Sequence, residues 1–274
     1  MRTLLSALNH IRGVVDVAGL LPMTSHVLLA EDVLTATNGR VALTIVLARG
    51  EDTRVRAAVP YAPLRAALQA CADRDWPQPI MAMVNEHLTI TGKQINVRLP
   101  TIPEDKFLRL GFDKDQPTHK AIMLPRKDAK LTLDDAFKLL APFTAVDATR
   151  PWSNAILHRK GFLYATNNVA AIRVAAPFVL PYEFKVPAEG ALEVAKLGHP
   201  SALFCSDSGV GFDYSTQALN AEVYTLQHAG EWPDVERLFE GIGTKLPRVP
   251  EGLKDAVATV ASIDDSLTNS VALE

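Results

Sequence analysis

An internal repeat constrains the fold of this chain more than any local motif does. Residues 22–38 read PMTSHVLLAEDVLTATN, and residues 151–167 read PWSNAILHRKGFLYATN. The two segments align without a gap, from Pro22 opposite Pro151 to Asn38 opposite Asn167, and both end in Ala-Thr-Asn. A second pair of landmarks, Val59-Pro60 and Val186-Pro187, follows at nearly the same spacing. The sequence therefore predicts two copies of one domain.

Within the first copy, helical and extended patterns alternate. Leu4, Leu8, Ile11 and Val15 follow the spacing of an amphipathic helix. Residues 26–29 and 33–47 are rich in Val, Leu, Ile and Thr and are interrupted by turn signals, which is typical of antiparallel strands. Pro63 is expected to begin a second helix that runs to residue 72, and residues 81–84 and 87–99 return to strand-like sequence. This order predicts an α+β domain.

The second copy repeats this order. Asp134 is expected to cap a helix that carries Phe137, Leu140 and Phe143. A second helix is expected between Pro187 and Leu197. Strands are predicted at residues 155–157, 162–165, 171–175, 202–204, 210–214 and 219–226. The polar segment 114–130 is interpreted as the connector between the copies.

These patterns divide the chain into three parts. Pro103 and Pro233 lie near the ends of the two copies, which we assign to residues 1–122 and 131–245. Residues 246–274 are interpreted as the start of an incomplete third copy, because Leu253, Val257 and Val260 form a helical stripe.

Composition excludes several classes of protein. A chain of 274 residues with 48% hydrophobic and 22% charged residues suits two globular domains. No apolar run approaches the roughly 20 residues that span a membrane, so no membrane partner is expected. Cys71 and Cys205 are far apart, which favours a reducing compartment and hence the cytoplasm. A net charge of −3 argues against a protein that coats nucleic acid with its whole surface.

The sequence contains no motif that is typical of an active site. The seven histidines lack metal-ligand spacing, so no metal is expected. Asp134-Asp135 resembles a carboxylate pair but stands where a helix cap is expected. Residues 206–209 lack the Gly-x-Ser-x-Gly pattern, and no phosphate-binding glycine loop occurs. We therefore expect no catalytic residue, no cofactor and no enzymatic activity.

The order of helix, strand pair, Ala-Thr-Asn strand, second helix and closing Trp232-Pro233-Asp234 resembles that of the bacterial-type DNA polymerase III beta sliding clamp family. The resemblance spans the chain and implies the DNA clamp fold, in which each domain has two helices facing a central channel and antiparallel sheets outside. The family typically has Asp where this chain has Asn38 and Asn167. Such departures favour a phage relative.

The resemblance implies a ring-forming processivity factor that tethers a DNA polymerase to duplex DNA. Its implied partners are duplex DNA bound without sequence preference, DNA polymerase, a clamp loader, other clamp-binding peptides and further copies of the chain in a homo-oligomeric ring. Two complete domains would close a six-domain ring as a trimer, and three would close it as a dimer. A chain that stays monomeric in solution is the third alternative.

Inward-facing basic residues would contact phosphates weakly and permit sliding. The candidate DNA-binding residues are Arg12, Arg65, Lys138, Arg150, Lys196 and Lys254. The alternative interpretation of each is an ordinary solvated surface charge.

In the resembled family, partner peptides enter a pocket of the second domain. The matching positions are Thr166, Asn168, Val169, Ala171, Pro233 and Leu238. The family commonly shows Gly-His/Tyr-Arg-Leu where this chain has Asn168-Val169-Ala170-Ala171. The alternatives are core packing at Thr166 and a hairpin turn held by the Asn side chain.

Two other functions stay open from the sequence. A clamp-derived binding module could recruit or inhibit replication proteins through the peptide pocket without encircling DNA. A hydrolase on a repeat scaffold would need clustered acids, histidines or a nucleophile that the sequence does not display.

Overall fold

The computed structural model describes residues 4–16, 21–47, 55–74, 79–112, 119–122, 130–146, 149–178, 180–215, 220–227 and 230–240, together with Gly252 and Asp255. The chain divides into two compact units, Met1–Trp232 and Pro233–Glu274. The first unit contains both repeated segments, residues 22–38 and 151–167. The domain boundaries at residues 122, 131 and 245 stay predictions, and the proposed third helix stripe at 253–260 lies outside the described residues except for Asp255.

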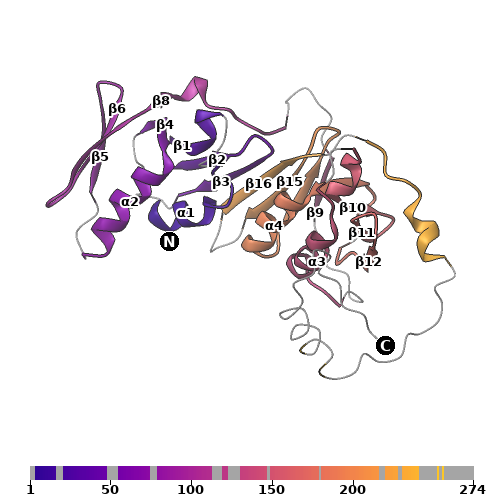
Figure 1. Ribbon diagram of the computed structural model, residues 1–274. Coiled ribbons are helices and arrows are strands. Elements are labelled where there is room, and N and C mark those ends of the chain that lie inside the picture. Colours follow the sequence, from indigo (N-terminus) through magenta and orange to yellow (C-terminus); the bar gives the residue numbers. More distant parts are fainter. Residues whose placement is uncertain are drawn as a thin grey trace. The chain divides into compact units, whose positions relative to one another are not determined.

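The first repeat runs from α1 to η2 (Figure 1). Its elements are α1 (Leu4–Ile11), η1 (Pro22–Ser25), β1 (His26–Ala30), β2 (Val33–Thr37), β3 (Val41–Val46), β4 (Arg56–Pro60), α2 (Tyr61–Ala72), β5 (Ile80–Val84), β6 (His87–Thr91), β7 (Asn96–Pro100), β8 (Ile102–Pro103) and η2 (Glu104–Lys106).

Strand β9 precedes α3, and from α3 to β16 the second repeat follows the order of α1 to β7. Its elements are β9 (His119–Ile122), α3 (Leu133–Leu140), η3 (Ala141–Phe143), η4 (Pro151–Asn154), β10 (Ala155–Arg159), β11 (Phe162–Thr166), β12 (Ala171–Ala175), β13 (Phe184–Pro187), α4 (Ala188–Leu197), β14 (Ala202–Cys205), β15 (Gly209–Ser215) and β16 (Asn220–Leu226). The described part of the second unit contains η5 (Val235–Phe239).

A nine-stranded sheet joins the two repeats. Its order is β8-β4-β1-β2-β3-β16-β15-β14-β9, and all of its pairings are antiparallel. The junction is the pairing of β3 with β16, in which Leu43 faces Val223 and Ala42 faces Tyr224. All four of these side chains are buried. The repeats are therefore connected by a hydrogen-bonded sheet as well as by the chain.

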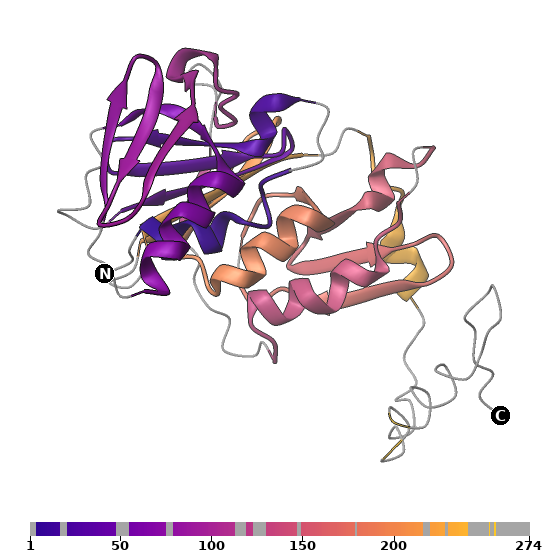
Figure 2. The ribbon, with the colours of Figure 1, turned by 60° about the vertical axis from the view of Figure 1, so that its left-hand side comes forward.

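Each repeat also has a smaller sheet and a pair of helices. The first repeat adds a three-stranded sheet, β5-β6-β7, and the second adds a four-stranded sheet, β12-β11-β10-β13. Helix α1 packs against α2, and α3 packs against α4 (Figure 2). With its antiparallel sheets and amphipathic helices the chain is an α+β protein, as the sequence predicts.

One hydrophobic core runs through both repeats. Leu8 of α1, Leu64 of α2, Phe137 of α3 and Val194 of α4 all belong to the same cluster of buried residues. The helices bury the stripe that the sequence periodicity predicts and leave their polar side to solvent. Burial of this shared apolar surface makes the two repeats one cooperative body.

Several boundaries differ from the sequence prediction. The second helix of the first repeat begins at Tyr61, two residues before Pro63, which occupies its first turn. Helix α1 ends at Ile11 rather than near Val15. Phe143 lies in η3, a short 3₁₀ turn that follows α3.

The N-cap of α3 is Thr132, not Asp134. The Thr132 hydroxyl oxygen accepts the Asp135 backbone N–H at 3.3 Å, and its O–H donates to the Asp135 carboxylate at 2.8 Å. Asp134 instead lies within the first turn, where its charge complements the helix dipole. Asp134 and Asp135 thus both serve the start of the helix.

The predicted connector 114–130 contains a strand, β9, that the sequence does not predict. Strand β9 pairs with β14, with Ala121 opposite Leu203. A short strand in a polar segment shows no alternation of apolar and polar residues, so it is recognised only by its pairing with the neighbouring strand.

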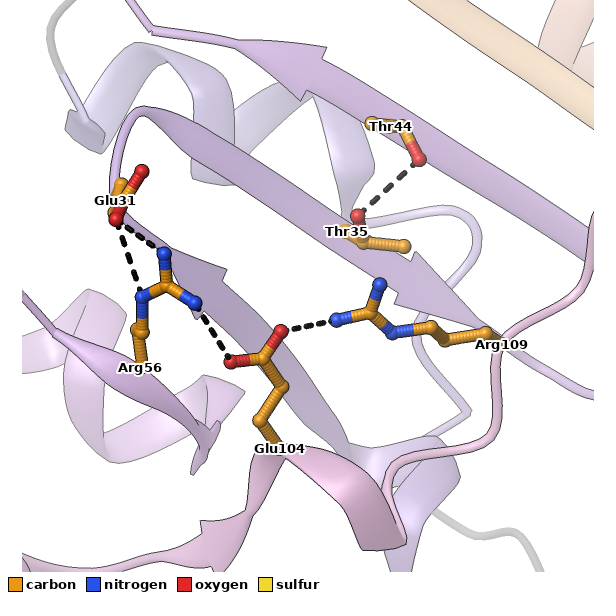
Figure 3. A network of polar contacts seen from close by, with 6 residues as sticks. All are labelled: Glu31, Thr35, Thr44, Arg56, Glu104 and Arg109. Atoms are coloured by element: carbon orange, nitrogen blue, oxygen red, sulfur yellow. Dashed lines mark hydrogen bonds and ion pairs between the residues drawn. The ribbon is translucent and has the colours of Figure 1, made fainter.

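A polar network closes one end of the nine-stranded sheet in the first repeat (Figure 3). Arg56 of β4 binds Glu31, in the turn after β1, and approaches Glu104 at 3.9 Å. Arg109 also binds Glu104. On the neighbouring strands, the hydroxyls of Thr35 and Thr44 are 3.2 Å apart. The network connects β1, β4 and η2 through charges that are exposed or, for Glu104, half-buried, and each such ion pair contributes little stability by itself.

Candidate nucleic-acid interface and partner groove

Three of the predicted DNA-binding residues come together near the C-terminal end of α1. Arg12 follows α1 directly and is exposed. Arg65 of α2 donates from Nε to the Asn9 side chain at 2.7 Å. Burial raises the pKa of the Tyr61 phenol, while the charges of Arg65 and Arg12 act in the opposite direction. Both arginines are therefore close enough to Tyr61 to act on it electrostatically.

Lys196 of α4 reaches the same place. A Cβ added at Gly13, next to Arg12, would overlap the Lys196 ammonium and the Glu193 carboxylate. Gly13 is thus the point where the turn after α1 approaches α4. Lys196 forms an ion pair with Glu193, three residues before it on the same helix. The three basic side chains are therefore accompanied by one acidic side chain, Glu193, which is paired with Lys196.

The other three candidates do not join this group in the described structure. Lys138 is exposed on α3 and pairs with Asp134 at 3.5 Å, an i,i+4 ion pair. Arg150 is the N-cap residue of η4, and its carbonyl accepts the Ser153 backbone N–H at 3.0 Å and the Ser153 hydroxyl at 2.8 Å. Lys254 lies outside the described residues.

The helices themselves are not strongly basic. Helices α1 to α4 contain three Lys or Arg residues and four Asp or Glu residues. Such a surface supports a few phosphate contacts of the weak, non-specific kind, because affinity for duplex DNA grows with the number of phosphates neutralised.

The Ala-Thr-Asn elements form the same turn in both repeats. The Asn167 side-chain oxygen accepts the backbone N–H groups of Val169 at 3.1 Å and Ala170 at 2.8 Å. In the first repeat the Asn38 oxygen accepts those of Arg40 at 2.9 Å and Val41 at 2.8 Å. The interpretation of Asn as a turn residue is confirmed. An Asp side chain could accept the same two bonds, so the substitution preserves the turn.

The threonines complete this turn. Thr166 donates its hydroxyl to the Ala170 carbonyl at 2.8 Å and accepts the Asn168 N–H at 3.1 Å, while Asn168 adopts a positive φ of 71°. Thr37 makes the equivalent contacts with Val41 and Gly39, and Gly39 has a φ of 88°. Thr166 is buried with its hydroxyl satisfied, so it supports the turn rather than offering a free polar group.

The remaining positions of the predicted peptide groove are open to solvent. Asn168 and Ala171 are exposed, and Val169 is 94% exposed at the tip of the turn. Pro233 and Leu238 belong to the second compact unit, where Leu238 is 59% exposed. The assignment of these six residues to one groove stays a prediction.

A cavity lies beside the corresponding turn of the first repeat. It has a volume of about 490 Å³ and is lined by Gly13, Val14, Val15, Asp16, Asn38, Arg40 and Glu189. Glu189, on the first turn of α4, accepts from the Asn38 amide at 3.4 Å and pairs with Arg40 at 3.8 Å. No local sequence pattern predicts this cavity, although the alignment of the repeats places Arg40 opposite Val169 of the predicted groove.

Among the described residues, potential metal ligands do not cluster and both thiols are buried. No cluster of three His, Cys, Asp or Glu residues that could hold an ion occurs there. Cys71 and Cys205 are both buried, and burial raises the pKa of the Cys205 thiol to about 11, which keeps it protonated. None of the described helices is long and apolar enough to cross a membrane.

Comparison with solved structures decides the fold. The beta subunit of DNA polymerase III from Pseudomonas aeruginosa superposes with a TM-score of 0.66 at 19% identity, over 95% of this chain and 72% of that one. The sliding clamp of Bacillus subtilis gives 0.72 at 12% identity, over 96% and 73%. This chain has the DNA clamp fold.

A third clamp-fold structure, the Helicobacter pylori beta clamp bound to a DNA ligase peptide, gives a TM-score of 0.69 at 15% identity, over 95% of this chain and 74% of that one. No protein-family model matches the sequence, and no curated protein matches it. The resemblance inferred from the repeat and the Ala-Thr-Asn turns is thus confirmed at the level of the fold.

Proposed function

We propose that this clamp-fold chain is a DNA sliding clamp, a ring-forming processivity factor that tethers a DNA polymerase to duplex DNA. The observation that carries the proposal is the continuous sheet across β3 and β16. At this junction one sequence repeat adds to the next, with buried apolar residues on both strands. A ring needs the same kind of junction between chains.

The outer edges of the smaller sheets are suited to such addition. Among the described residues, β12 has a strand partner only on the β11 side, and β7 only on the β6 side. Strand β12 follows the second Ala-Thr-Asn turn as β3 follows the first. A second copy could therefore continue the sheet head to tail, and such contacts close into a ring when the rotation per copy closes.

In a closed ring the chain would act by topology. A ring around duplex DNA cannot leave sideways, so an attached polymerase stays at a high effective concentration. Arg12, Arg65 and Lys196 provide the phosphate contacts, with Lys138, Arg150 and Lys254 as further candidates. The chain would act without catalysis, in the cytoplasm, and would need a loader to open the ring.

Short peptides from polymerase, loader and other replication proteins are the proposed partners of the β11–β12 turn. The solved Helicobacter pylori clamp carries a ligase peptide. In this chain, exposed apolar Val169 beside Ala171 offers a contact for such a peptide. Pro233 and Leu238 are the further positions that the family resemblance assigns to this partner.

A second candidate is a clamp-fold binding module that recruits or inhibits replication proteins without encircling DNA. The charge of the helices favours it, since acids outnumber bases on α1 to α4 and both Lys138 and Lys196 are paired with acids of their own helix.

Solution mass by light scattering, with nicked circular DNA and with the same DNA linearised, separates the two. A sliding clamp should form an oligomer that is retained on circular DNA and lost from linear DNA. A monomer indifferent to the shape of the DNA would contradict the ring and support the binding module.

The DNA contact is tested with Arg12→Gln/Arg65→Gln. If both arginines meet phosphates, the slope of log affinity against log salt should fall by about two. The matched control is Arg56→Gln/Arg109→Gln, which removes two exposed arginines from the network of Figure 3 and should leave the slope unchanged. Equal slopes for both variants would contradict the assignment.

A further inference from the structure

Arg40 stands at a turn that both repeats build, but the second repeat has no charge at this position. In the alignment of the repeats Arg40 lies opposite Val169. In both turns the side-chain oxygen of the Asn residue accepts the same two backbone N–H groups. The turn therefore forms with an apolar residue at this position, and the fold does not require the charge of Arg40.

The backbone of Arg40 is fixed, while its side chain is exposed. Its N–H donates to the Asn38 side-chain oxygen at 2.9 Å, and its carbonyl oxygen accepts the Leu226 N–H at 2.9 Å. The side chain is 73% exposed, and its Nη1 is 3.8 Å from the Glu189 carboxylate. An exposed ion pair at this distance contributes little stability, so exchanging Glu189 for another anion costs little.

Glu189 has further interactions that do not depend on Arg40. Its second carboxylate oxygen, Oε2, accepts from the Asn38 amide at 3.4 Å. Glu189 also lies in the first turn of α4, where the helix dipole favours a negative charge. The carboxylate therefore keeps these interactions when the ion pair opens, and the Arg40 guanidinium is the group that is free to move.

The cavity beside this turn places Arg40 near the three basic side chains at the end of α1. Arg40 and Gly13 line the same cavity. Gly13 follows Arg12 in the chain and lies against the Lys196 ammonium. Because affinity for duplex DNA grows with the number of phosphates neutralised, a fourth cation at this place would add to the same interface.

We propose that Arg40 is a further DNA-contacting residue that exchanges partners on binding. In the free chain its guanidinium pairs with Glu189, and on duplex DNA it leaves this carboxylate and binds a backbone phosphate. Asp16 and Glu189 also line the cavity, so the phosphate meets the exposed end of Arg40 outside the cavity. One ion pair replaces another, so the contact is weak and compatible with sliding. The inference rests on the proposed DNA contact of the neighbouring basic side chains.

Binding of a fluorescein-labelled duplex oligonucleotide, followed by anisotropy over a salt series, tests the contact. Arg40→Gln should lower the slope of log affinity against log salt by about one. Glu189→Gln should tighten binding at low salt by up to about fivefold, the change that corresponds to about 1 kcal/mol for an exposed ion pair. Arg56→Gln and Glu31→Gln are the matched controls, since they break an exposed ion pair elsewhere in the first repeat and should leave binding unchanged.

The double variant Arg40→Gln/Glu189→Gln separates partner exchange from simple charge repulsion. If Glu189 restrains Arg40, Glu189→Gln should tighten binding only in a chain that retains Arg40. Equal tightening with and without Arg40 would overturn the proposal, because Glu189 would then act on the DNA directly. Circular dichroism of each variant shows that it is folded.

The variant Arg12→Gln/Arg65→Gln distinguishes failure of this inference from failure of the proposed function. An unchanged salt slope in that variant would remove the proposed DNA interface and the Arg40 contact together. A lower slope in that variant, with an unchanged slope in Arg40→Gln, would overturn the Arg40 contact alone.

Discussion

The two repeats place the same elements in the same order but fill one central core position differently. Leu29 on β1 and His158 on β10 are equivalent in the alignment of the repeats, and both side chains are fully buried. His158 lies among aromatic rings, stacked on Phe184 with ring centroids 4.8 Å apart and tilted against Phe178 at 5.2 Å. Its Nδ1 is 2.7 Å from the Tyr182 carbonyl oxygen. The fold therefore accepts a polar side chain there when a backbone group satisfies it.

The repeats also reverse the charges of an ion pair between equivalent strands, β1 and β4 in the nine-stranded sheet and β10 and β13 in the four-stranded sheet. In the first repeat, basic Arg56 on β4 binds acidic Glu31 after β1. In the second, basic Arg159 at the end of β10 binds acidic Glu183 before β13, with two bonds of 2.7 and 2.9 Å. Both repeats thus place a complementary ion pair here with the acid and the base exchanged.

The largest expected effect comes from helix α3, in the part of the shared core that lies in the second repeat. Phe137 is equivalent to Leu8 of the first repeat and is fully buried. Its ring meets the Phe212 ring edge to face, with the ring centroids 6.1 Å apart. Phe137→Ala should lower the free energy of unfolding by about 3–5 kcal/mol and Leu8→Ala by about 2–5 kcal/mol. Because one core and one sheet span both repeats, urea denaturation followed by fluorescence and circular dichroism should show a single shifted transition. Two separate transitions would contradict this cooperativity.

The next effect concerns the buried histidine. Desolvation lowers the pKa of His158, so its neutral form is the folded form. The stabilisation from keeping it neutral is complete above about pH 6.5, where the unfolded chain is also neutral, and is lost as the pH falls toward the lowered folded pKa. His158→Leu, which copies Leu29, should remove this acid dependence of the free energy of unfolding. At neutral pH it also removes Nε2, which is buried and has no hydrogen-bond partner among the described residues.

A series of urea titrations between pH 7 and 5 measures the effect. His199→Gln, at an exposed histidine, is the control and should keep the wild-type pH dependence. If the free energy of unfolding of His158→Leu fell with decreasing pH as steeply as that of the wild type, groups other than His158 would be responsible for the pH dependence.

A smaller effect compares the two reversed ion pairs. The hydrogen bond from Arg159, together with its charge, lowers the pKa of the Glu183 carboxyl. The resulting stabilisation is present above about pH 4.3 and is lost as the pH falls. After discounting for solvent screening, Glu183→Gln should cost about 1 kcal/mol or less near neutral pH. The effect of Arg56→Gln should be smaller, because Arg56 is 61% exposed and the Arg159 side chain only 20%. Thermal unfolding at low and high salt would rank the stability losses of the two variants. A larger loss of stability in Arg56→Gln than in Glu183→Gln would contradict this prediction.

The smallest effect lies in the hairpin turns. Glu86 after β5 and Lys160 after β10 adopt positive φ angles of 60° and 49°, which L-residues disfavour. Glu86→Gly and Lys160→Gly should each raise the free energy of unfolding by roughly 0.5–1 kcal/mol, since glycine tolerates this conformation but loses more entropy on folding. Ser208→Gly, in the turn between β14 and β15 without a positive φ, should not share the gain. Calorimetry would detect the difference in melting temperature.

The sequence by itself determined the order of elements and most of their positions. The gapless alignment of residues 22–38 with 151–167 predicts the repeat, helix α4 begins after Pro187 as expected, and both Ala-Thr-Asn segments form the predicted turns. These features depend on residues close together in the chain, because helix periodicity, the fixed φ of proline and the reach of an Asn side chain are local properties.

Only the tertiary structure decided which distant segments meet. Strand β9 in the polar connector, the pairing of Leu43 with Val223 and the approach of Arg12, Arg65 and Lys196 have no local signature. Each depends on hydrogen bonds or packing between segments that are far apart in the chain, and such pairings are selected by the burial of the whole core rather than by any one strand.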